Sequence, residues 1–286
     1  MEITDIGYFT KNKQKVREMN LILIKRFNLD KKEKLKYFGL PSEEMKDISL
    51  WKEYLSNVSA VERGIKGQEH IKQHNLLLRS FLLGISDKIK LYRGEMDDIL
   101  MRGKDSYGQK VDYPYHLINL DYTGGVFYKE ERDKSKRIDS IKSLFRNQAK
   151  FRQDFLFFIT CNMDNNINEE HSNFMQKALK KLNDSEKEKL FMENYGNPDK
   201  KTQLKVLTIS LIQDLAKEFF ECETYTPIFY EGNNETKMVN FSFRLKYVDK
   251  YVTEKKVKLN DEEIIKFPVY ICKEGLLEKK DLPINL

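Results

Sequence analysis

The sequence predicts an α/β fold around a mostly parallel sheet, and three observations support this prediction. Apolar stretches of strand length alternate with segments of helical periodicity along most of the chain. Residues 155–160 are apolar and aromatic up to a final threonine, which is typical of a strand buried on both faces. Two further stretches, 225–230 and 239–248, flank the turn sequence Glu231-Gly232-Asn233-Asn234 and predict a closing antiparallel hairpin.

Short apolar runs that end in turn residues predict the strands. Before the hairpin, strands are expected over 35–40, 58–61, 89–92, 115–121 and 155–160. After it, residues 264–272 are expected either to add one more strand or to pack as a tail.

Helices are predicted where apolar residues recur every three or four positions. The signature Ser42-Glu43-Glu44 predicts one helix start, because serine accepts from unpaired N–H groups and acidic residues suit the first turn. The expected helices are 11–27, 42–55, 67–83, a short one through 98–100, 137–151, 169–182 and 201–220.

Composition limits the class of protein. The 286 residues are 40% hydrophobic and 34% charged, with a mean hydropathy of −0.65, which is enough for a core and too polar for a membrane protein. The three cysteines are far apart and odd in number, which suits a reducing compartment. No secretory signal is recognisable, so a cytoplasmic location without membrane association is expected. His70 and His74 have helical spacing but no third ligand nearby, so no metal site is expected.

Charge is concentrated at the N-terminus. Residues 1–36 carry ten Lys and Arg against five Asp and Glu, a net +5 of the +6 for the whole chain. This segment is interpreted as a solvated basic helix or as an arm that contacts phosphates or an acidic partner protein. The expected organisation is a basic helical extension over 1–33, one α/β domain over 34–248, and a C-terminal elaboration over 249–286 packed on it.

Ligands of parallel α/β sheets bind beyond the carboxyl ends of the strands, so strand-end residues are the candidates for a site. Glu62 follows the second strand, where a carboxylate can accept from both ribose hydroxyls. Glu95, with Asp97 and Asp98 as alternatives, follows the third strand and can accept from an adenine amino group. Gly39 allows close approach of a ligand to the first turn. The Gly-x-Gly-x-x-Gly and P-loop fingerprints are absent, which argues against an ordinary NAD enzyme and a P-loop NTPase.

The most specific feature is Asn119-Leu120-Asp121-Tyr122-Thr123-Gly124-Gly125 at the end of the fourth strand. Asp121 and nearby carbonyls can accept the N–H bonds of a planar amine, and Tyr122 can stack on a base. The alternative is a tight turn with a structural Asp121 that accepts backbone N–H groups.

The order of these elements resembles the class I S-adenosylmethionine-dependent methyltransferases over residues 34–248. Tyr37-Phe38-Gly39-Leu40-Pro41 stands at that family's glycine-rich first loop, Val61-Glu62 at its ribose acid, and Arg93-Gly94-Glu95 at its adenine contact. Asn119-Leu120-Asp121-Tyr122 stands at the Asp/Asn-Pro-Pro-Tyr position and is similar to the motif of tRNA N2-guanine dimethyltransferases. The sequence departs from the family in having one glycine in the first loop, followed by bulky residues, and in lacking the catalytic-motif proline.

The resemblance implies S-adenosylmethionine (SAM) as cofactor and an exocyclic amine of a nucleic-acid base as methyl acceptor. Asn119, Asp121 and Tyr122 would be catalytic, and Gly39, Glu62, Glu95 and Asp121 would hold the cofactor. RNA or DNA phosphates would meet the N-terminal cations and four arginines, Arg132, Arg137, Arg146 and Arg152. Two alternatives remain: a catalytically silent methyltransferase fold that binds a partner protein or nucleic acid within a larger complex, and a fold that binds another adenosine-containing ligand. The volume beside Gly39 distinguishes the first alternative from an active enzyme: the silent fold is expected if Leu40 and Pro41 fill the methionine site.

Overall fold

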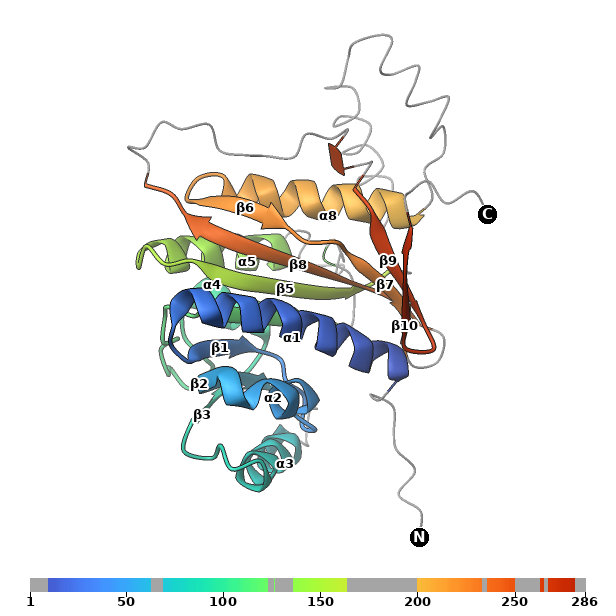
Figure 1. Ribbon diagram of the computed structural model, residues 1–286. Helices are drawn as coiled ribbons and strands as arrows, with labels where there is room; N and C mark the ends of the chain where they lie inside the picture. Colours follow the sequence, from blue (N-terminus) through green and yellow to red (C-terminus); the bar gives the residue numbers. More distant parts are fainter. Residues whose placement is uncertain are drawn as a thin grey trace, which may run out of the picture.

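The computed structural model describes residues 10–62, 69–122, 126, 136–163, 200–232, 236–249, 263–264 and 267–280. The predicted α/β class is confirmed, with helices on both faces of a central sheet (Figure 1). The expected helix 169–182 lies outside the described residues. Within the described part of the chain, no helix combines the length and apolar character that crossing a bilayer requires.

Five parallel strands form the centre of the sheet, as the strand–helix alternation predicted. They are β1 (Leu35–Gly39), β2 (Leu55–Glu62), β3 (Ile89–Arg93), β4 (Leu117–Asp121) and β5 (Phe155–Asn162). Their order is β3-β2-β1-β4-β5, so the chain reverses its direction of winding between β1 and β4. Carboxyl ends on either side of that switch point open onto a common crevice.

Antiparallel strands continue the sheet beyond β5. The predicted hairpin is confirmed as β7 (Ile228–Glu231) and β8 (Lys237–Tyr247), and β8 pairs antiparallel with β5. This arrangement places an antiparallel strand directly beside the last parallel strand, β5. β6 (Phe220–Thr224) pairs with the far end of β8, while β9 (Val269–Lys273) and β10 (Leu276–Lys280) extend the edge from β7.

Two separate hydrophobic clusters cover the two faces of the sheet. One packs α4 (Met96–Arg102), α5 (Lys136–Ala149) and α8 (Lys200–Ala216) against one face. The other packs α1 (Lys11–Lys31), α2 (Lys46–Trp51) and α3 (Glu69–Leu82) against the opposite face (Figure 1). Because side chains alternate along a strand, Tyr37 and Phe38 of β1 enter different clusters.

The basic helix α1 lies along the sheet instead of projecting from it. Ile24 and Phe27 are buried with Tyr37 and Trp51, and Val16 packs against Tyr230. The helix starts at Thr10, whose side chain accepts from the Lys13 backbone N–H. Its exposed cations therefore lie on the outer side of a packed helix.

Two predicted helix boundaries are wrong. Ser42 does not cap α2: the helix begins at Lys46, after Met45 with a φ of 50°, and no side chain caps it. The helical segment is short because a 3₁₀ turn, Lys52–Tyr54, leads directly into β2 at Leu55. The expected helix over 201–220 likewise ends at Ala216, since Phe220 already belongs to β6.

Candidate active site

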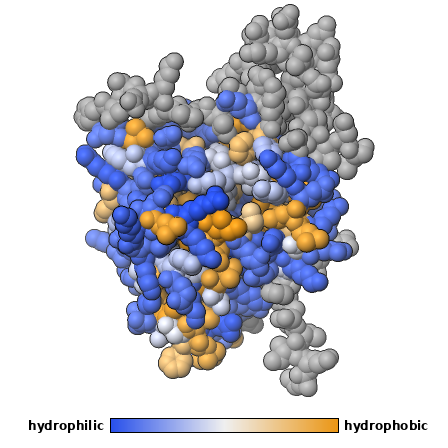
Figure 2. Space-filling view, viewed as in Figure 1, coloured by the Kyte–Doolittle hydropathy of each residue, from blue (hydrophilic) through white to orange (hydrophobic). Residues whose placement is uncertain are grey.

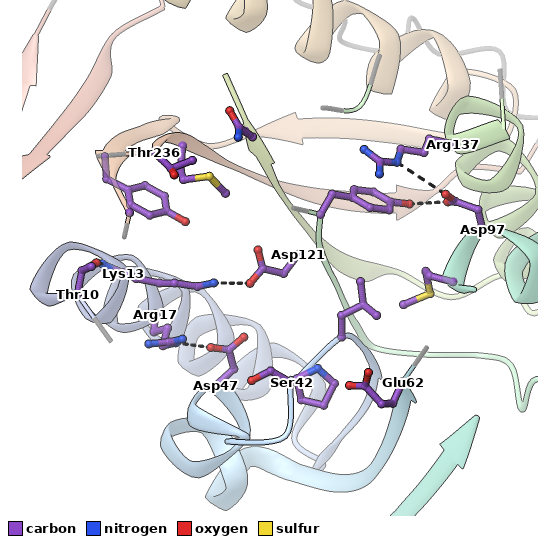
Figure 3. A pocket seen from close by; sticks show the side chains of 18 of the residues that line it. Thr10, Lys13, Arg17, Ser42, Asp47, Glu62, Asp97, Asp121, Arg137 and Thr236 are labelled. Carbon is purple, nitrogen blue, oxygen red and sulfur yellow. Dashed lines mark hydrogen bonds and ion pairs between the residues drawn. The ribbon is translucent and has the colours of Figure 1, made fainter. Parts of the chain in front are cut away.

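A cavity of about 460 Å³ lies beyond the carboxyl ends of the parallel strands (Figure 3). The ends of β2 and β4 and the turns after β1 and β3 form one side, and the first turns of α1 and the hairpin β7–β8 form the other. It is lined by Thr10, Lys13, Arg17, Leu40, Pro41, Ser42, Asp47, Glu62, Gly94, Glu95, Met96, Asp97, Asp121, Tyr122, Arg137, Asn162, Tyr230, Gly232, Thr236 and Met238.

Two predicted acidic residues, Glu62 and Glu95, line the same cavity. Glu62 is the last residue of β2. Glu95 is the N-cap residue of α4, but its side chain accepts no capping hydrogen bond from the helix. Gly94, between β3 and Glu95, is required to be glycine, because its φ is 130° and an added Cβ would lie 2.4 Å from Ser106 Oγ. Leu40 and Pro41 also line the cavity, so these bulky residues leave space beside β1.

Gly39 does not line this cavity, contrary to the expectation that it admits a ligand. A Cβ at this position would lie 2.4 Å from both the Asn119 carbonyl oxygen and the Tyr37 hydroxyl. Glycine is therefore required by packing between β1 and β4.

Asp121, predicted to be catalytic and to contact the cofactor, lies in the cavity at the end of β4. Its carboxylate pairs with Lys13 of α1, with Nζ 2.7 Å from Oδ2 (Figure 3). Both side chains are about one-fifth exposed. Burial acts to lower the pKa of Lys13, but the charges of Asp121 and Asp47 outweigh it and the pKa is raised.

Asn119 is not placed for direct contact with a ligand in this cavity. Its side chain is buried and absent from the cavity lining, and its amide donates to Asp47 Oδ2 at 3.0 Å. Asn119 and Asp121 point toward the same face because they are two residues apart on a strand. In this structure Asn119 holds Asp47, and its catalytic role stays a prediction.

Tyr122 points to the opposite face and is 95% buried. Its hydroxyl donates to Asp97 Oδ1 at 2.9 Å, and the Arg137 guanidinium covers its ring at 4.5 Å from the centroid (Figure 3). Ser140 donates to the same Asp97 oxygen at 2.7 Å. Burial and then the Asp97 charge raise the pKa of Tyr122, so the phenol stays protonated. One face of the ring is therefore already occupied by Arg137, where base stacking was expected.

The three predicted phosphate-binding arginines that the structure describes do not form one surface. Arg137 lies in the cavity beside Asp97, with Nε 3.7 Å from Oδ2. Arg146 is exposed further along α5, about 13.5 Å away at 1.5 Å per helical residue, and Arg152 is exposed beyond the end of that helix. Arg132 lies outside the described residues.

The chain can be assigned to a family from its sequence. A model of the family described as PP_RS20740-like matches residues 8–213, well over half of the 286 residues. The chain belongs to the PP_RS20740-like family. The matched region contains all cavity-lining residues except the four contributed by β7, β8 and the turn between them. No curated protein matches the chain.

Three solved structures with a similar course of the chain are distant in sequence. Cofactor-bound Rv0187 from MTB is 12% identical, with a TM-score of 0.44, covering 85% of this chain and 83% of that one. The methyltransferase domain of bacterial CtHen1-C is 12% identical with a TM-score of 0.44, covering 82% and 99% respectively. Trm5b from Pyrococcus abyssi is 7% identical with a TM-score of 0.46, covering 84% and 51%.

The part of the cavity that α1 and α2 contribute was not predicted from the sequence. Arg17, one helical turn after Lys13, donates from Nε to Asp47 Oδ1, and both side chains are more than nine-tenths buried (Figure 3). The Trp51 indole N–H donates to the Arg17 carbonyl at 3.2 Å and fixes α2 against α1. The i, i+4 spacing of Lys13 and Arg17 was a visible signal for a shared face. Their partners, 108 and 30 residues away, carried no local signal.

Strand register adds a polar row beneath α1. Asp121 pairs across the sheet with Thr160, and Thr160 with Asn240. The Asn240 amide donates to Thr160 Oγ1 at 2.9 Å, and Ser242 Oγ donates to Asn20 Oδ1 at 3.1 Å. Burying polar side chains costs free energy unless they are hydrogen-bonded, so the row is satisfied by its own members and α1.

Proposed function

We propose that this protein is a SAM-dependent methyltransferase that acts on an exocyclic amine of a nucleic-acid base. One observation carries the proposal: a single cavity at the carboxyl ends of the strands brings together Glu62, Glu95 and Asp121. These are the positions that hold ribose, adenine and acceptor amine in the family that the sequence resembles. A volume of about 460 Å³ is within the range of small-molecule sites.

The residues present fit an adenosine-containing cofactor. Glu62 would accept from the ribose hydroxyls, and Glu95 from the adenine amino group. Leu40, Pro41 and Met96 supply apolar surface along the cavity between these carboxylates and Asp121. When bound, SAM supplies an activated methyl group.

Asp121 would accept an N–H of the incoming amine and orient its lone pair. In this role Asp121 would align the amine with the methyl group. Such alignment can lower the activation free energy of a two-substrate reaction by several kcal/mol. The Lys13 ammonium holds the Asp121 carboxylate on the cavity side of β4. Tyr122 would act as a positioning residue, because Asp97 and Arg137 hold it at the end of β4.

A nucleic-acid substrate is supported by charge. Residues 1–36 have a net charge of +5, and Lys25 and Arg26 are exposed on the outer side of α1. Contacts between these cations and the phosphates of a nucleic acid would make substrate binding weaken as the salt concentration rises. A base in a duplex would have to leave the stack to reach Asp121.

The second candidate is a catalytically silent subunit that binds a partner protein through α1. It is favoured by Gly39, the single glycine at the end of β1, which serves packing, and by the ion pair that Asp121 already makes with Lys13. The lining position of Leu40 and Pro41 favours the active enzyme, because the space beside β1 is open.

Methyl transfer from radiolabelled SAM to total RNA and to single-stranded DNA tests the proposal. Asp121→Ala is expected to reduce transfer at least tenfold while binding of S-adenosylhomocysteine (SAH) persists, and the exposed Asp87→Ala serves as the matched control. Cofactor binding without transfer to either nucleic acid would count against the base-amine proposal. Transfer that survives Asp121→Ala would remove Asp121 from the mechanism.

A further inference from the structure

A second, much smaller cavity lies behind the Lys13–Asp121 pair. Its volume of about 10 Å³ corresponds to roughly one oxygen-sized probe. It is lined by Lys13, Val16, Arg17, Asn20, Asp47, Trp51, Asn119, Asp121, Thr160, Tyr230 and Asn240. Five of these residues also line the large cavity: Lys13, Arg17, Asp47, Asp121 and Tyr230. This inner recess is therefore a polar extension of the proposed acceptor end.

Two hydrogen-bond donors in the inner recess lack a partner among the described residues. They are Arg17 Nη1 and the Tyr230 hydroxyl, on side chains that are 6% and 4% exposed. A buried donor without a partner costs about 1–3 kcal/mol, so two at one place are an unusual feature. Burial and then the Asp121 charge raise the pKa of Tyr230, which keeps its hydroxyl proton in place.

The charges of the recess specify a neutral ligand group. Its two cations, Lys13 and Arg17, already pair with its two anions, Asp121 and Asp47. A further buried charge would be uncompensated, whereas an uncharged oxygen would satisfy both unpaired donors.

Lys13 and Asp121 line both cavities, so their ion pair lies where the two adjoin. Lys13 is on the first turn of α1, and its flexible side chain can leave Asp121 without moving the helix. An acceptor amine that replaces the Lys13 ammonium at Asp121 brings neighbouring atoms of the same molecule toward Tyr230 and Arg17.

We propose that the inner recess recognises a carbonyl oxygen of the methyl acceptor through Tyr230 and Arg17 while Asp121 accepts its amine. The inference rests on the methyltransferase function proposed above and narrows its substrate class. Bases that carry both an amine and a carbonyl, as guanine and cytosine do, fit this arrangement. Adenine has an amine and no carbonyl, and each of its ring nitrogens has a single lone pair, so one ring nitrogen cannot pair with both donors as a carbonyl oxygen can.

The test is calorimetric titration of the full chain with guanosine, cytidine and adenosine, with and without saturating SAH. The SAH-loaded protein is expected to bind guanosine or cytidine at least about fivefold more tightly than adenosine. Tyr230→Phe should abolish this preference, leave SAH affinity within twofold, and leave the thermal midpoint unchanged or higher because it removes an unsatisfied hydroxyl. Tyr247→Phe, at the far end of β8, is the matched control and should retain the preference.

Equal affinities for the three nucleosides, or a preference that survives Tyr230→Phe, would overturn the inference. So would the absence of any nucleoside binding to the SAH-loaded protein. Failure to bind SAH is a separate result that contradicts the proposed cofactor. In that case, the titrations without SAH still decide whether the recess discriminates carbonyl-bearing bases.

Discussion

Lys13 Nζ lies 2.7 Å from Asp121 Oδ2 and joins the first turn of α1 to the end of β4. The pair connects the basic N-terminal helix with the carboxylate that the sequence singles out for catalysis. Four residues later on α1, Arg17 makes a second connection through Asp47 to Asn119 of β4. Two ionic contacts thus fix the helix across the mouth of the candidate active site.

Replacing Lys13 by methionine should lower the free energy of unfolding by about 1 kcal/mol near neutral pH, because Asp121 loses its partner in a partly exposed pair. The folded pKa of Lys13 is raised above 10.5, so its contribution is complete below that pH and is lost as the pH rises through the folded value. Urea unfolding of both proteins between pH 8 and 11 measures this. A difference that stays constant up to pH 11 would contradict the assigned titration.

Replacing Arg17 by methionine should destabilise the protein by about 3 kcal/mol, because the Asp47 carboxylate is left buried without its cation. Adding Asp47→Asn to this variant removes the stranded charge and should recover part of the loss. Denaturant unfolding of both single variants and the double variant gives the coupling free energy between Arg17 and Asp47. Strictly additive losses would argue that Arg17 and Asp47 do not interact in solution.

Tyr122→Phe tests whether Tyr122 positions the end of β4. Loss of the hydroxyl removes the donor to Asp97, and we expect about 1–2 kcal/mol lower stability because the acceptor is charged. The ring remains under Arg137, so SAH affinity should change by less than twofold. Unchanged stability with lost nucleic-acid affinity would favour the original stacking role.

Gly39→Ala should lower stability by about 2 kcal/mol, because its Cβ would meet the Asn119 carbonyl and the Tyr37 hydroxyl. Gly232→Ala is a suitable comparison, since there the nearest atom is Met238 Cγ at 3.3 Å. Thermal unfolding of the two variants measures how much stability each added Cβ costs, and so shows whether Gly39 is needed for packing. A stable Gly39→Ala protein that fails to bind SAH would restore Gly39 to the cofactor site.

The central parallel strands were predictable because their signals are local. Apolar runs such as Phe155–Asn162 and the alternation in β8 identify strands directly. The rule that ligands bind beyond the carboxyl ends then led to Glu62, Glu95 and Asp121, all of which line one cavity. Helix limits were less predictable: Ser42 has a good capping side chain, but its φ of 57° places it in a turn.

The inner part of the site depends on tertiary pairing that no local pattern encodes. Asn119 stands two residues before Asp121 in the sequence, but the contact of its side-chain amide with Asp47 has no local signal. Arg137 and Arg152 looked alike in sequence, but α5 separates them. The polar row from Asp121 to Thr160 to Asn240 exists only in the register of three strands.

The central claim is that the cavity holds an adenosine cofactor between Glu62 and Glu95, and calorimetric titration with SAH tests it most directly. We expect saturable one-to-one binding that weakens at least tenfold in Glu62→Ala, since hydrogen bonds to a charged group contribute about 1.5–3 kcal/mol. The exposed Glu53→Ala should bind like the wild type. A folded protein that does not bind SAH, or one whose affinity is unchanged by Glu62→Ala, would contradict the account.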